Sequence, residues 1–311
     1  MKTFYIITDA TSDLCLDLRK EYDIDVINGH IVLPDKREIL GGPTWDWCTR
    51  EEFYRNLKRD PNGYTTSPAN VGEFFQAMKA YAAEGKPLLV MTISSGISGT
   101  YNFALKAREM VLQEYPDAVI ACVDSLRFGS GFGLMAVHAS LCRERGLSIY
   151  ETVDYLEQNK NRFHQAGWHD DLAFVAKKGR ITHANAFLGT LVGIKPIGEF
   201  DYNGLTTVIG KAKGTKNAYR ALLHYIENTA EQPEDQIFFI AHANREQQAM
   251  EYKAMIEERF HPKAIYVNDI YPCCSINTGP GLMAAYYIGK PISTDLSEER
   301  KLIERFINAE A

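Results

Sequence analysis

Apolar runs alternate with helix-like stretches along the first half of the chain. Four short runs rich in apolar and β-branched residues predict strands at 4–7, 24–33, 87–93 and 118–123. Intervening stretches, several of which begin at capping residues, predict helices at about 11–22, 49–58, 70–83, 100–114, 130–144 and 148–161. Strands that alternate with helices are typical of an α/β unit with a parallel sheet.

The second half of the chain has a different pattern. Strand-like runs are found at 191–200, 205–211, 237–241 and 264–267. The first two runs are joined at 201–204, where Asn-Gly is a strong hairpin signal. Helices are expected at about 185–192, 216–228, 245–259, 282–288 and 297–309. The segment 173–176 is interpreted as a short strand or a turn.

The change of pattern near 160–168 indicates two domains, in keeping with a length of 311 residues. The predicted fold class is α/β. We expect an N-terminal α/β domain at 1–162 with a parallel, Rossmann-like sheet. We also expect a C-terminal α/β domain at 163–295 with a mixed or antiparallel sheet, followed by a helical extension at 296–311.

Composition and charge narrow the classes of function. Apolar residues make up 45% and charged residues 24%, as in ordinary globular proteins. The 34 Lys and Arg residues against 40 Asp and Glu residues give a net charge of −6, which disfavours non-specific binding to nucleic acids or anionic membranes. No apolar stretch reaches the length of a membrane span, about 18 residues, so only transient membrane contact stays open. Six cysteines without a C-x-x-C motif are typical of free thiols, and we expect a cytoplasmic protein.

The loop at 94–101 carries the strongest chemical signal. It joins a predicted strand directly to a predicted helix and reads Ser-Ser-Gly-Ile-Ser-Gly-Thr-Tyr. Backbone N–H groups at the start of a helix attract anions, and the hydroxyls of Ser94, Ser95 and Ser98 can add donors. The loop lacks both the Walker lysine and the G-x-S-x-G spacing of a nucleophile elbow. It is therefore interpreted as an anion site, with a serine-rich helix cap as the alternative.

Two further hydroxyl clusters are present. Thr65-Thr66-Ser67-Pro68 precedes a predicted helix, and Thr278 follows Asn277 in a turn that is expected to open the helix at 282–288. Alone, each cluster is typical of a cap and a turn. Three such helix openings without an adjacent catalytic base favour binding of a carboxylate or a phosphate over the breaking of a bond.

Other motifs point less clearly to function. Gly131 and Gly133 match a dinucleotide fingerprint but lie too far beyond the preceding strand, which favours helix packing. The eight histidines lack the spacing of metal ligands, so no metal site is predicted, and 169–171 is interpreted as a solvated loop. Two basic clusters are either solvated surface or a docking patch for an acidic partner or a phosphate: Lys177, Lys178 and Arg180, and Lys211, Lys213 and Lys216.

Taken together, these segments resemble the DegV family of bacterial fatty-acid-binding proteins. Each segment is weakly specific by itself, but the ordered set is specific. The matching segments run from about 7 to 285: Ile7-Thr-Asp-Ala-Thr-Ser-Asp13, Thr65-Thr-Ser-Pro68, Ile93-Ser-Ser-Gly-Ile-Ser-Gly-Thr-Tyr101, Val123-Asp-Ser125, Asp170-Asp171, Lys178-Gly-Arg-Ile181, Gly193-Ile-Lys-Pro196 and Thr278-Gly-Pro-Gly281.

The resemblance implies a protein that holds a long-chain fatty acid between two α/β domains and catalyses nothing itself. The acyl chain would lie in an apolar tunnel in the second domain, and no cofactor is expected beyond the bound lipid. A separate fatty acid kinase subunit would phosphorylate the carboxylate. At the interdomain crevice, the carboxylate would be bound by Thr65, Thr66, Ser94, Ser95, Gly96, Asn277 and Thr278. The candidate contacts for the kinase are Lys178, Arg180, Lys211 and Lys213.

One position departs from the family pattern. Family members usually carry a histidine before Thr-Gly-Pro-Gly, and this chain has Asn277, whose amide can donate a hydrogen bond but cannot carry positive charge. Two alternatives therefore stay open. The loop at 94–101 could serve an enzyme or a binding protein for a small phosphorylated or carboxylated ligand. The hydroxyl-rich turns could also be simple caps in an interaction module.

Overall fold

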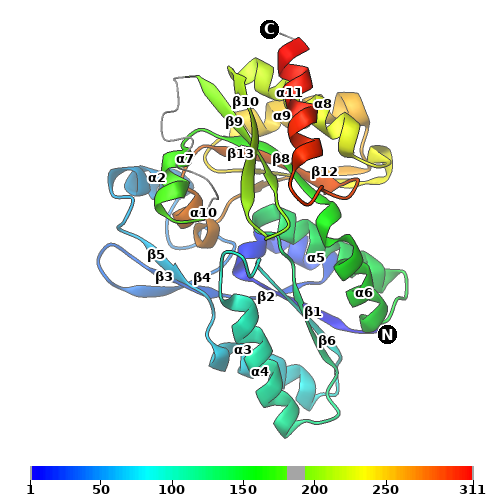
Figure 1. The fold of residues 1–311 in the computed structure, drawn as a ribbon. Helices are drawn as coiled ribbons and strands as arrows, with labels where there is room; N and C mark the ends of the chain where they lie inside the picture. Colours follow the sequence, from blue (N-terminus) through cyan, green and yellow to red (C-terminus); the bar gives the residue numbers. More distant parts are fainter. Residues whose placement is uncertain (1, 181–192, 310–311) are drawn as a thin grey trace. The chain divides into compact units, whose positions relative to one another are not determined.

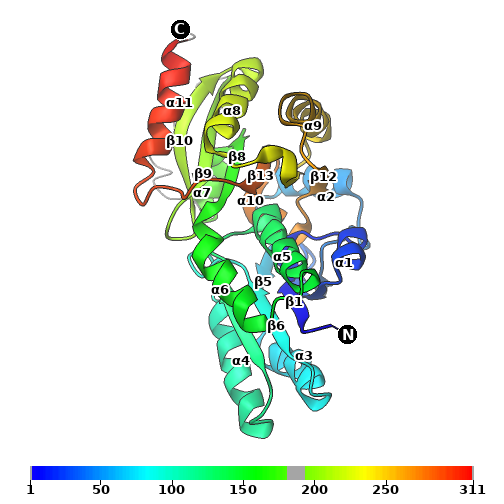
Figure 2. The same cartoon turned by 90° about the vertical axis from the view of Figure 1, so that its right-hand side faces the viewer.

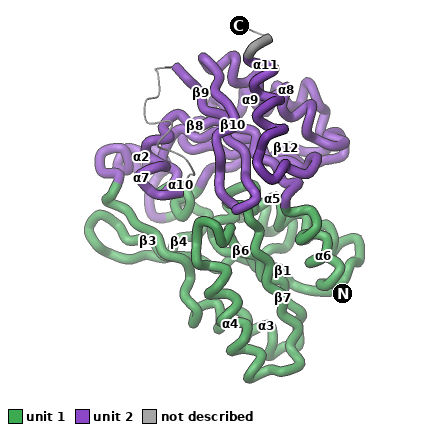
Figure 3. Tube along the Cα trace, viewed as in Figure 1, with its two compact units in different colours: residues 1–46, 62–160, 271–276 green, residues 47–61, 161–270, 277–311 purple. Residues whose placement is uncertain are grey.

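The computed structural model describes residues 2–180 and 193–309 (Figure 1). The chain divides into two compact units whose segments alternate along the sequence (Figure 3). The first unit comprises Met1–Asp46, Asn62–Lys160 and Tyr271–Ile276, and the second comprises Trp47–Pro61, Asn161–Ile270 and Asn277–Ala311. The predicted domains at 1–162, 163–295 and 296–311 cut the chain at other places, and they stay a proposal about its folding units.

A parallel sheet forms the centre of the first unit. Its four strands lie in the order β2-β1-β6-β7. Their bounds are β1 Tyr5–Asp9, β2 Asp25–Ile27, β6 Leu88–Thr92 and β7 Ile120–Asp124. All five residues of β6 are buried, as expected of a central strand in a parallel sheet. The predicted parallel sheet is confirmed.

Helices cover both faces of this sheet (Figure 2). α3 and α4 pack together over one face, where the core contains Ile7, Phe74, Met78 and Val90. α5 lies on the other face, in contact with α1 and α6. The helices are η1 Ala10–Ser12, α1 Leu16–Tyr22, α3 Val71–Ala83, α4 Thr100–Glu114, α5 Gly129–Glu144 and α6 Ile149–Asn159. α10, Pro272–Thr278, ends in the second unit.

A small antiparallel sheet in the first unit differs from the sequence prediction. Its order is β4-β3-β5, with β3 Gly29–Val32, β4 Glu38–Gly41 and β5 Thr65–Ser67. The single strand predicted at 24–33 is wrong, because its two halves belong to different sheets. Asn28-Gly29, a turn signal inside the apolar run, marks the break.

The second unit is built on a mixed sheet of order β10-β9-β8-β13-β11-β12. Only β11 and β12 pair in parallel; the other pairs are antiparallel. The strands are β8 Phe163–His169, β9 Ile194–Phe200, β10 Thr206–Lys213, β11 Ile237–His242, β12 Ala264–Asp269 and β13 Leu282–Ile288. This sheet confirms the mixed sheet predicted for the second half, and the β9–β10 hairpin confirms the Asn-Gly signal.

The helices of the second unit come from distant parts of the chain. α8 packs on β8, β9 and β10, and α9 packs on β11 and β12. The terminal helix α11 packs on α8 and β10, where Ile303 lies over Gly210 with no room for a Cβ atom between them. The helices are α2 Arg50–Arg59, η2 Lys160–Arg162, which begins in the first unit, α7 Leu172–Lys177, α8 Thr215–Thr229, η4 Pro233–Asp235, α9 Glu246–Phe260 and α11 Ser297–Ala309. Across the described residues, none of the helices combines the length and the apolar character that a bilayer crossing requires.

Two predictions in the second half are wrong, and one strand is missing from the sequence prediction. The segment 282–288 is the central strand β13 rather than a helix, because a short, fully apolar run has no periodicity that separates the two. Strand β8 was not predicted, since its seven buried residues include His164, Gln165 and His169. The segment 173–176 lies in helix α7. The helix predicted at 185–192 falls outside the described residues.

Candidate functional site

The carboxyl ends of β1 and β6 form the first candidate site. The helix α1 after β1 and the helix α4 after β6 lie on opposite faces of the parallel sheet. Open α/β sheets bind ligands outside the carboxyl ends of their strands at such a switch point. β6 ends at Thr92, so the predicted anion loop begins at this place.

The loop after β6 presents Ser95 and Gly96 to solvent and buries Ser94. The Ser94 N–H donates to the Arg127 carbonyl at 2.9 Å, the Ser95 N–H to Asp124 Oδ1 at 3.0 Å, and the Gly96 N–H to Ser94 Oγ at 3.1 Å. These three N–H groups are therefore engaged within the protein. Their part in binding an anion stays a prediction, and the exposed Ser95 hydroxyl is the group of this loop best placed to bind one.

Two carboxyl groups accept hydrogen bonds from the backbone of this loop. Asp9, at the end of β1, accepts from the Ile93 N–H at 2.7 Å and from the Thr11 N–H at 2.8 Å. Burial raises the pKa of Asp9, while these hydrogen bonds act in the opposite direction. Asp124, at the end of β7, holds both Ser95 and Leu126 through their N–H groups. The strands on either side of β6 thus fix the backbone of the loop that carries Ser95.

Arg127 is a candidate residue that sequence reasoning missed. It is fully buried, and its carbonyl accepts from Ser94 N–H at 2.9 Å and from Ser125 Oγ at 2.8 Å. Its guanidinium donates through Nη1 to the Leu126 carbonyl at 2.7 Å, so the residue ties the segment after β7 to the loop after β6. The only sequence signal was its place after the predicted strand that ends in Val123-Asp-Ser125.

The predicted hydroxyl cluster at 65–68 forms strand β5 and the connection to α3. Thr65 and Ser67 are exposed and Thr66 is half-buried. β5 pairs with β3, which sets Thr66 opposite Ile31. The following helix is closed by a capping box, in which Asn70 and Glu73 bond each other's backbone N–H. The prediction that this cluster precedes a helix is confirmed.

Asn277 and Thr278, which belong to the second unit, end helix α10. The Thr278 carbonyl accepts from His169 Nε2 at 2.9 Å, and His169 Nδ1 accepts from the Asp171 N–H at 2.9 Å. The ring is therefore neutral, and burial lowers the pKa of His169 to about 4. Gly279 and Gly281 follow with φ of 73° and 110°, which strongly favour glycine. The turn leads into a strand and not, as predicted, into a helix.

An ion-paired cluster lies beside this turn. Asp170 Oδ1 accepts from Lys195 Nζ at 2.5 Å, and Asp170 Oδ2 accepts from Arg245 Nε at 2.7 Å. Burial would raise the pKa of Asp170, but the bonds from the two cations outweigh it and the pKa is lowered. The interpretation of 169–171 as a solvated loop is wrong for His169 and Asp170, since the first is buried and the second is ion-paired.

The predicted partner contacts lie in two places in the second unit. Lys178 follows α7 and donates to the Pro61 carbonyl at 2.8 Å, while Arg180 is exposed. Lys211 and Lys213 are exposed on the edge strand β10. Their role in binding a partner stays a prediction. Within residues 2–180 and 193–309, the side chains do not assemble a group of three or more His, Cys, Asp or Glu suited to a metal ion.

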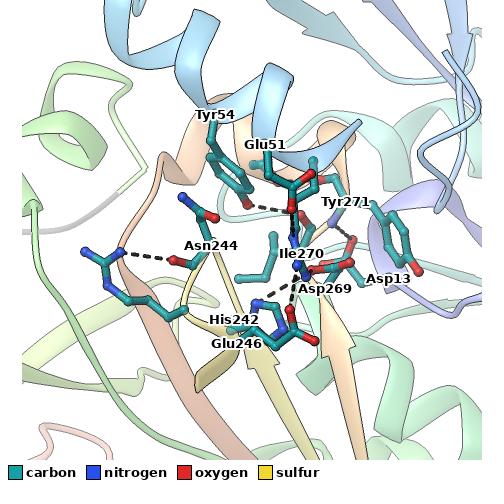
Figure 4. Close-up of polar contacts among 12 residues, drawn as sticks. Asp13, Glu51, Tyr54, His242, Asn244, Glu246, Asp269, Ile270 and Tyr271 are labelled. Carbon is teal, nitrogen blue, oxygen red and sulfur yellow. Dashed lines mark hydrogen bonds and ion pairs between the residues drawn. The ribbon is translucent and has the colours of Figure 1, made fainter. Parts of the chain in front are cut away.

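A second polar cluster lies at the carboxyl ends of β11 and β12 (Figure 4). Arg50 of α2 donates to Asp269 Oδ1 at 2.9 Å and to Glu246 Oε2 at 2.5 Å. His242 is buried, with its Nδ1 3.6 Å from Asp269 Oδ1. Burial lowers the pKa of His242, and the Tyr54 hydroxyl donates to the Ile270 carbonyl at 3.3 Å. These contacts fasten α2 to the second unit.

Comparison with known proteins places the chain in a family. The family model described as "Uncharacterised protein, DegV family" matches residues 3–290, so α11 lies beyond the matched part. A DegV domain-containing protein of Clostridium perfringens is 33% identical over 289 residues, which cover 93% of this chain and 98% of the relative. A DegV domain-containing protein of Lactococcus lactis is 31% identical, with coverage of 93% and 98%.

Solved structures agree with this placement. A DegV family protein from Thermus thermophilus, described as fatty-acid binding, aligns with a TM-score of 0.82 and 25% identity and covers 93% of this chain and 100% of that one. A stearic acid-binding protein from Eubacterium ventriosum aligns with a TM-score of 0.81 and 21% identity, with coverage of 92% and 98%. At that lower identity the likeness concerns the fold alone. From the family match and the curated relatives together, the chain belongs to the DegV family.

Proposed function

We propose that this protein binds a long-chain fatty acid and is a carrier rather than an enzyme. The observation that carries the proposal is the full-length match to the fatty-acid-binding protein of Thermus thermophilus, at 25% identity and a TM-score of 0.82. The site at the carboxyl ends of β1 and β6 supports it, because Asp9 and Asp124 fix the backbone of the loop that carries the exposed Ser95.

The head group of the ligand is bound by hydroxyl and amide donors in this proposal. Hydrogen bonds to an ionised carboxylate are stronger than bonds between neutral groups. Ser95, which is exposed in the loop after β6, is the central donor. The proposed carboxylate-binding residues are Thr65, Thr66, Ser94, Ser95, Gly96, Asn277 and Thr278.

The acyl chain supplies most of the affinity. Each methylene removed from water contributes about 0.8 kcal/mol, so a long chain outweighs any single hydrogen bond. We place this chain in an apolar tunnel within residues 163–295, a range in which the sheet of the second unit carries buried apolar side chains that include Phe238, Phe239 and Ile240. The head group then fixes the orientation of the ligand.

A separate kinase subunit acts on the presented carboxylate in this proposal. Lys178, Arg180, Lys211 and Lys213 are the contacts we assign to it, because three of them are exposed and all four carry positive charge. The six cysteines are free thiols, which fits a reducing cytoplasm, where a kinase also finds ATP.

Native mass spectrometry of the purified protein, followed by lipid extraction, tests the proposal. We expect one long-chain fatty acid per chain, either bound at purification or taken up after oleate is added. A protein that stays empty under both conditions would contradict it. If such an empty protein bound a small phosphorylated or carboxylated compound instead, the alternative ligand class at the loop 94–101 would replace the fatty acid.

A further inference from the structure

His30 lies between two carboxylates in the first unit. Its Nε2 is 2.9 Å from Glu73 Oε2, and its Nδ1 is 2.7 Å from Glu38 Oε1. An ionised carboxylate only accepts hydrogen bonds, so both ring nitrogens must carry protons. The side chain is therefore an imidazolium, bonded to β4 through Glu38 and to the first turn of α3 through Glu73.

The same residue also binds the strand that precedes α3. In the β3–β5 ladder, His30 is the direct partner of Ser67. His30 therefore binds both ends of the connection from Ser67 to Glu73. It pairs with Ser67 in the β3–β5 ladder, and its imidazole bonds Glu73. This connection begins with the Thr65–Ser67 strand, to which we assign two carboxylate-binding residues.

Glu73 couples the imidazole to the helix start. Its Oε2 accepts both from His30 Nε2 and from the Asn70 N–H, at 2.9 and 2.7 Å. The hydrogen bond with Glu73 raises the pKa of His30, with smaller contributions from charge attraction to both glutamates, against the opposing effect of burial. Burial would raise the pKa of Glu73, but the bonds from His30 and Asn70 lower it.

We propose that the doubly bonded imidazolium of His30 positions the Thr65–Ser67 segment, so that carboxylate affinity falls when His30 loses its proton. The inference rests on the proposed function and adds a positioning residue to that site. Glu38 from β4 and Glu73 from α3 are the charged groups that face the ring, and β5 contributes the uncharged Ser67.

The direction of the pH effect follows from the shift. A histidine whose folded pKa is raised stabilises the structure fully below its unfolded pKa of about 6.5. That stabilisation is lost as the pH rises through the folded pKa. Glu38 is 59% exposed, so we expect the partly buried Glu73 to carry most of the effect.

Glu73→Gln is the sharpest test, because glutamine also serves at this position of a capping box and the helix start is kept. Oleate affinity is measured from pH 6 to pH 9, and the His30 ring is titrated by NMR in the same samples. For the wild type we expect oleate affinity to fall about two- to fivefold as the pH rises through the His30 titration, because a partly exposed ion pair contributes only a modest energy. In Glu73→Gln, the midpoint of the fall in affinity and the midpoint of the His30 titration should move together to lower pH.

Glu151→Gln is the matched control, since Glu151 closes the capping box of α6 without a histidine partner. It should move neither midpoint. Wild-type affinity that stays constant while His30 titrates would overturn the inference and leave the proposed function standing. Absence of oleate binding at every pH would overturn the proposed function instead. Hydrogen exchange of the β5 amides tests whether His30 positions this strand. Exchange that becomes faster as His30 loses its proton supports the positioning role, and an exchange rate that does not change with the protonation of His30 refutes it.

Discussion

Each unit has polar side chains at the carboxyl ends of a pair of parallel strands, and the two places differ in how those side chains are used. At the ends of β1 and β6 in the first unit, Asp9 accepts a hydrogen bond from the Ile93 N–H in the loop after β6, and Ser95 of the same loop is exposed to solvent. At the ends of β11 and β12 in the second unit, Asp269 and Arg50 bond each other.

The difference separates a binding position from a structural joint. The strand ends are alike in geometry, but in the second unit donors and acceptors are bonded to one another and attach helix α2. In the first unit the acids position a loop whose hydroxyl remains accessible. Position in an α/β sheet indicates where a ligand could bind, and the hydrogen-bond partners decide whether it can.

The largest expected effect comes from Asp9→Ala in the first unit. The substitution leaves the Ile93 and Thr11 N–H groups without their acceptor. Buried donors without partners cost about 1–3 kcal/mol each, so we expect a loss of about 3 kcal/mol in the free energy of unfolding. Urea denaturation measures it, with the exposed Asp117→Ala as the control. A loss below that of the control would contradict the assigned role of Asp9.

Asp269→Ala tests the joint in the second unit. Arg50 loses one of its three carboxylate partners, Glu51, Glu246 and Asp269, at a site where the Arg50 and Asp269 side chains are about four-fifths buried. We expect a loss of about 1–2 kcal/mol in the free energy of unfolding, with fatty-acid affinity unchanged. Denaturation and oleate titration separate these two quantities. A large fall in affinity with little loss of stability would show that this cluster belongs to the binding site.

Ser95→Ala should weaken oleate binding by about tenfold, the equivalent of one hydrogen bond to a charged group, and leave the free energy of unfolding nearly unchanged. Ser98→Ala is the matched control in the same loop, because the Ser98 hydroxyl is paired with Thr100 Oγ1 at 2.7 Å. Equal losses in the two variants would indicate a disturbed loop rather than a lost donor.

The smallest effect is expected from Asn277→His. It introduces the residue that the resemblance to the family leads us to expect here, and a protonated histidine forms a stronger, charge-assisted bond to a carboxylate. We expect oleate affinity to rise about threefold at pH 6 and to return to the wild-type value at pH 8, where the new imidazole is neutral. Unchanged affinity at pH 6 would place this position outside the carboxylate site.

The parallel sheet and the Ser94 loop could be predicted because their signals are local. An apolar run followed by small hydroxyl residues and a capped helix identifies a strand, a loop and a helix without reference to the rest of the chain. Ser95 therefore became a candidate from the sequence alone, and its exposure agrees with that choice.

Residues that depend on distant partners could not be found in this way. Asp170 is bonded to Lys195 and Arg245, which lie 25 and 75 positions away, and His30 is bonded to Glu73 at a separation of 43. β8 was missed for the same reason: the buried His164 is satisfied by Glu199 of β9, at 2.7 Å, and a lone sequence gives no sign of that pairing.

The most direct test of the central claim compares oleate with oleyl alcohol, which has the same chain but no carboxylate. Wild-type protein and Ser95→Ala are titrated with both ligands, which makes a thermodynamic cycle between one side chain and one head group. We predict that the wild type prefers oleate and that Ser95→Ala loses most of this preference. Equal affinity of the wild type for both ligands, or a preference that survives in Ser95→Ala, would contradict the account.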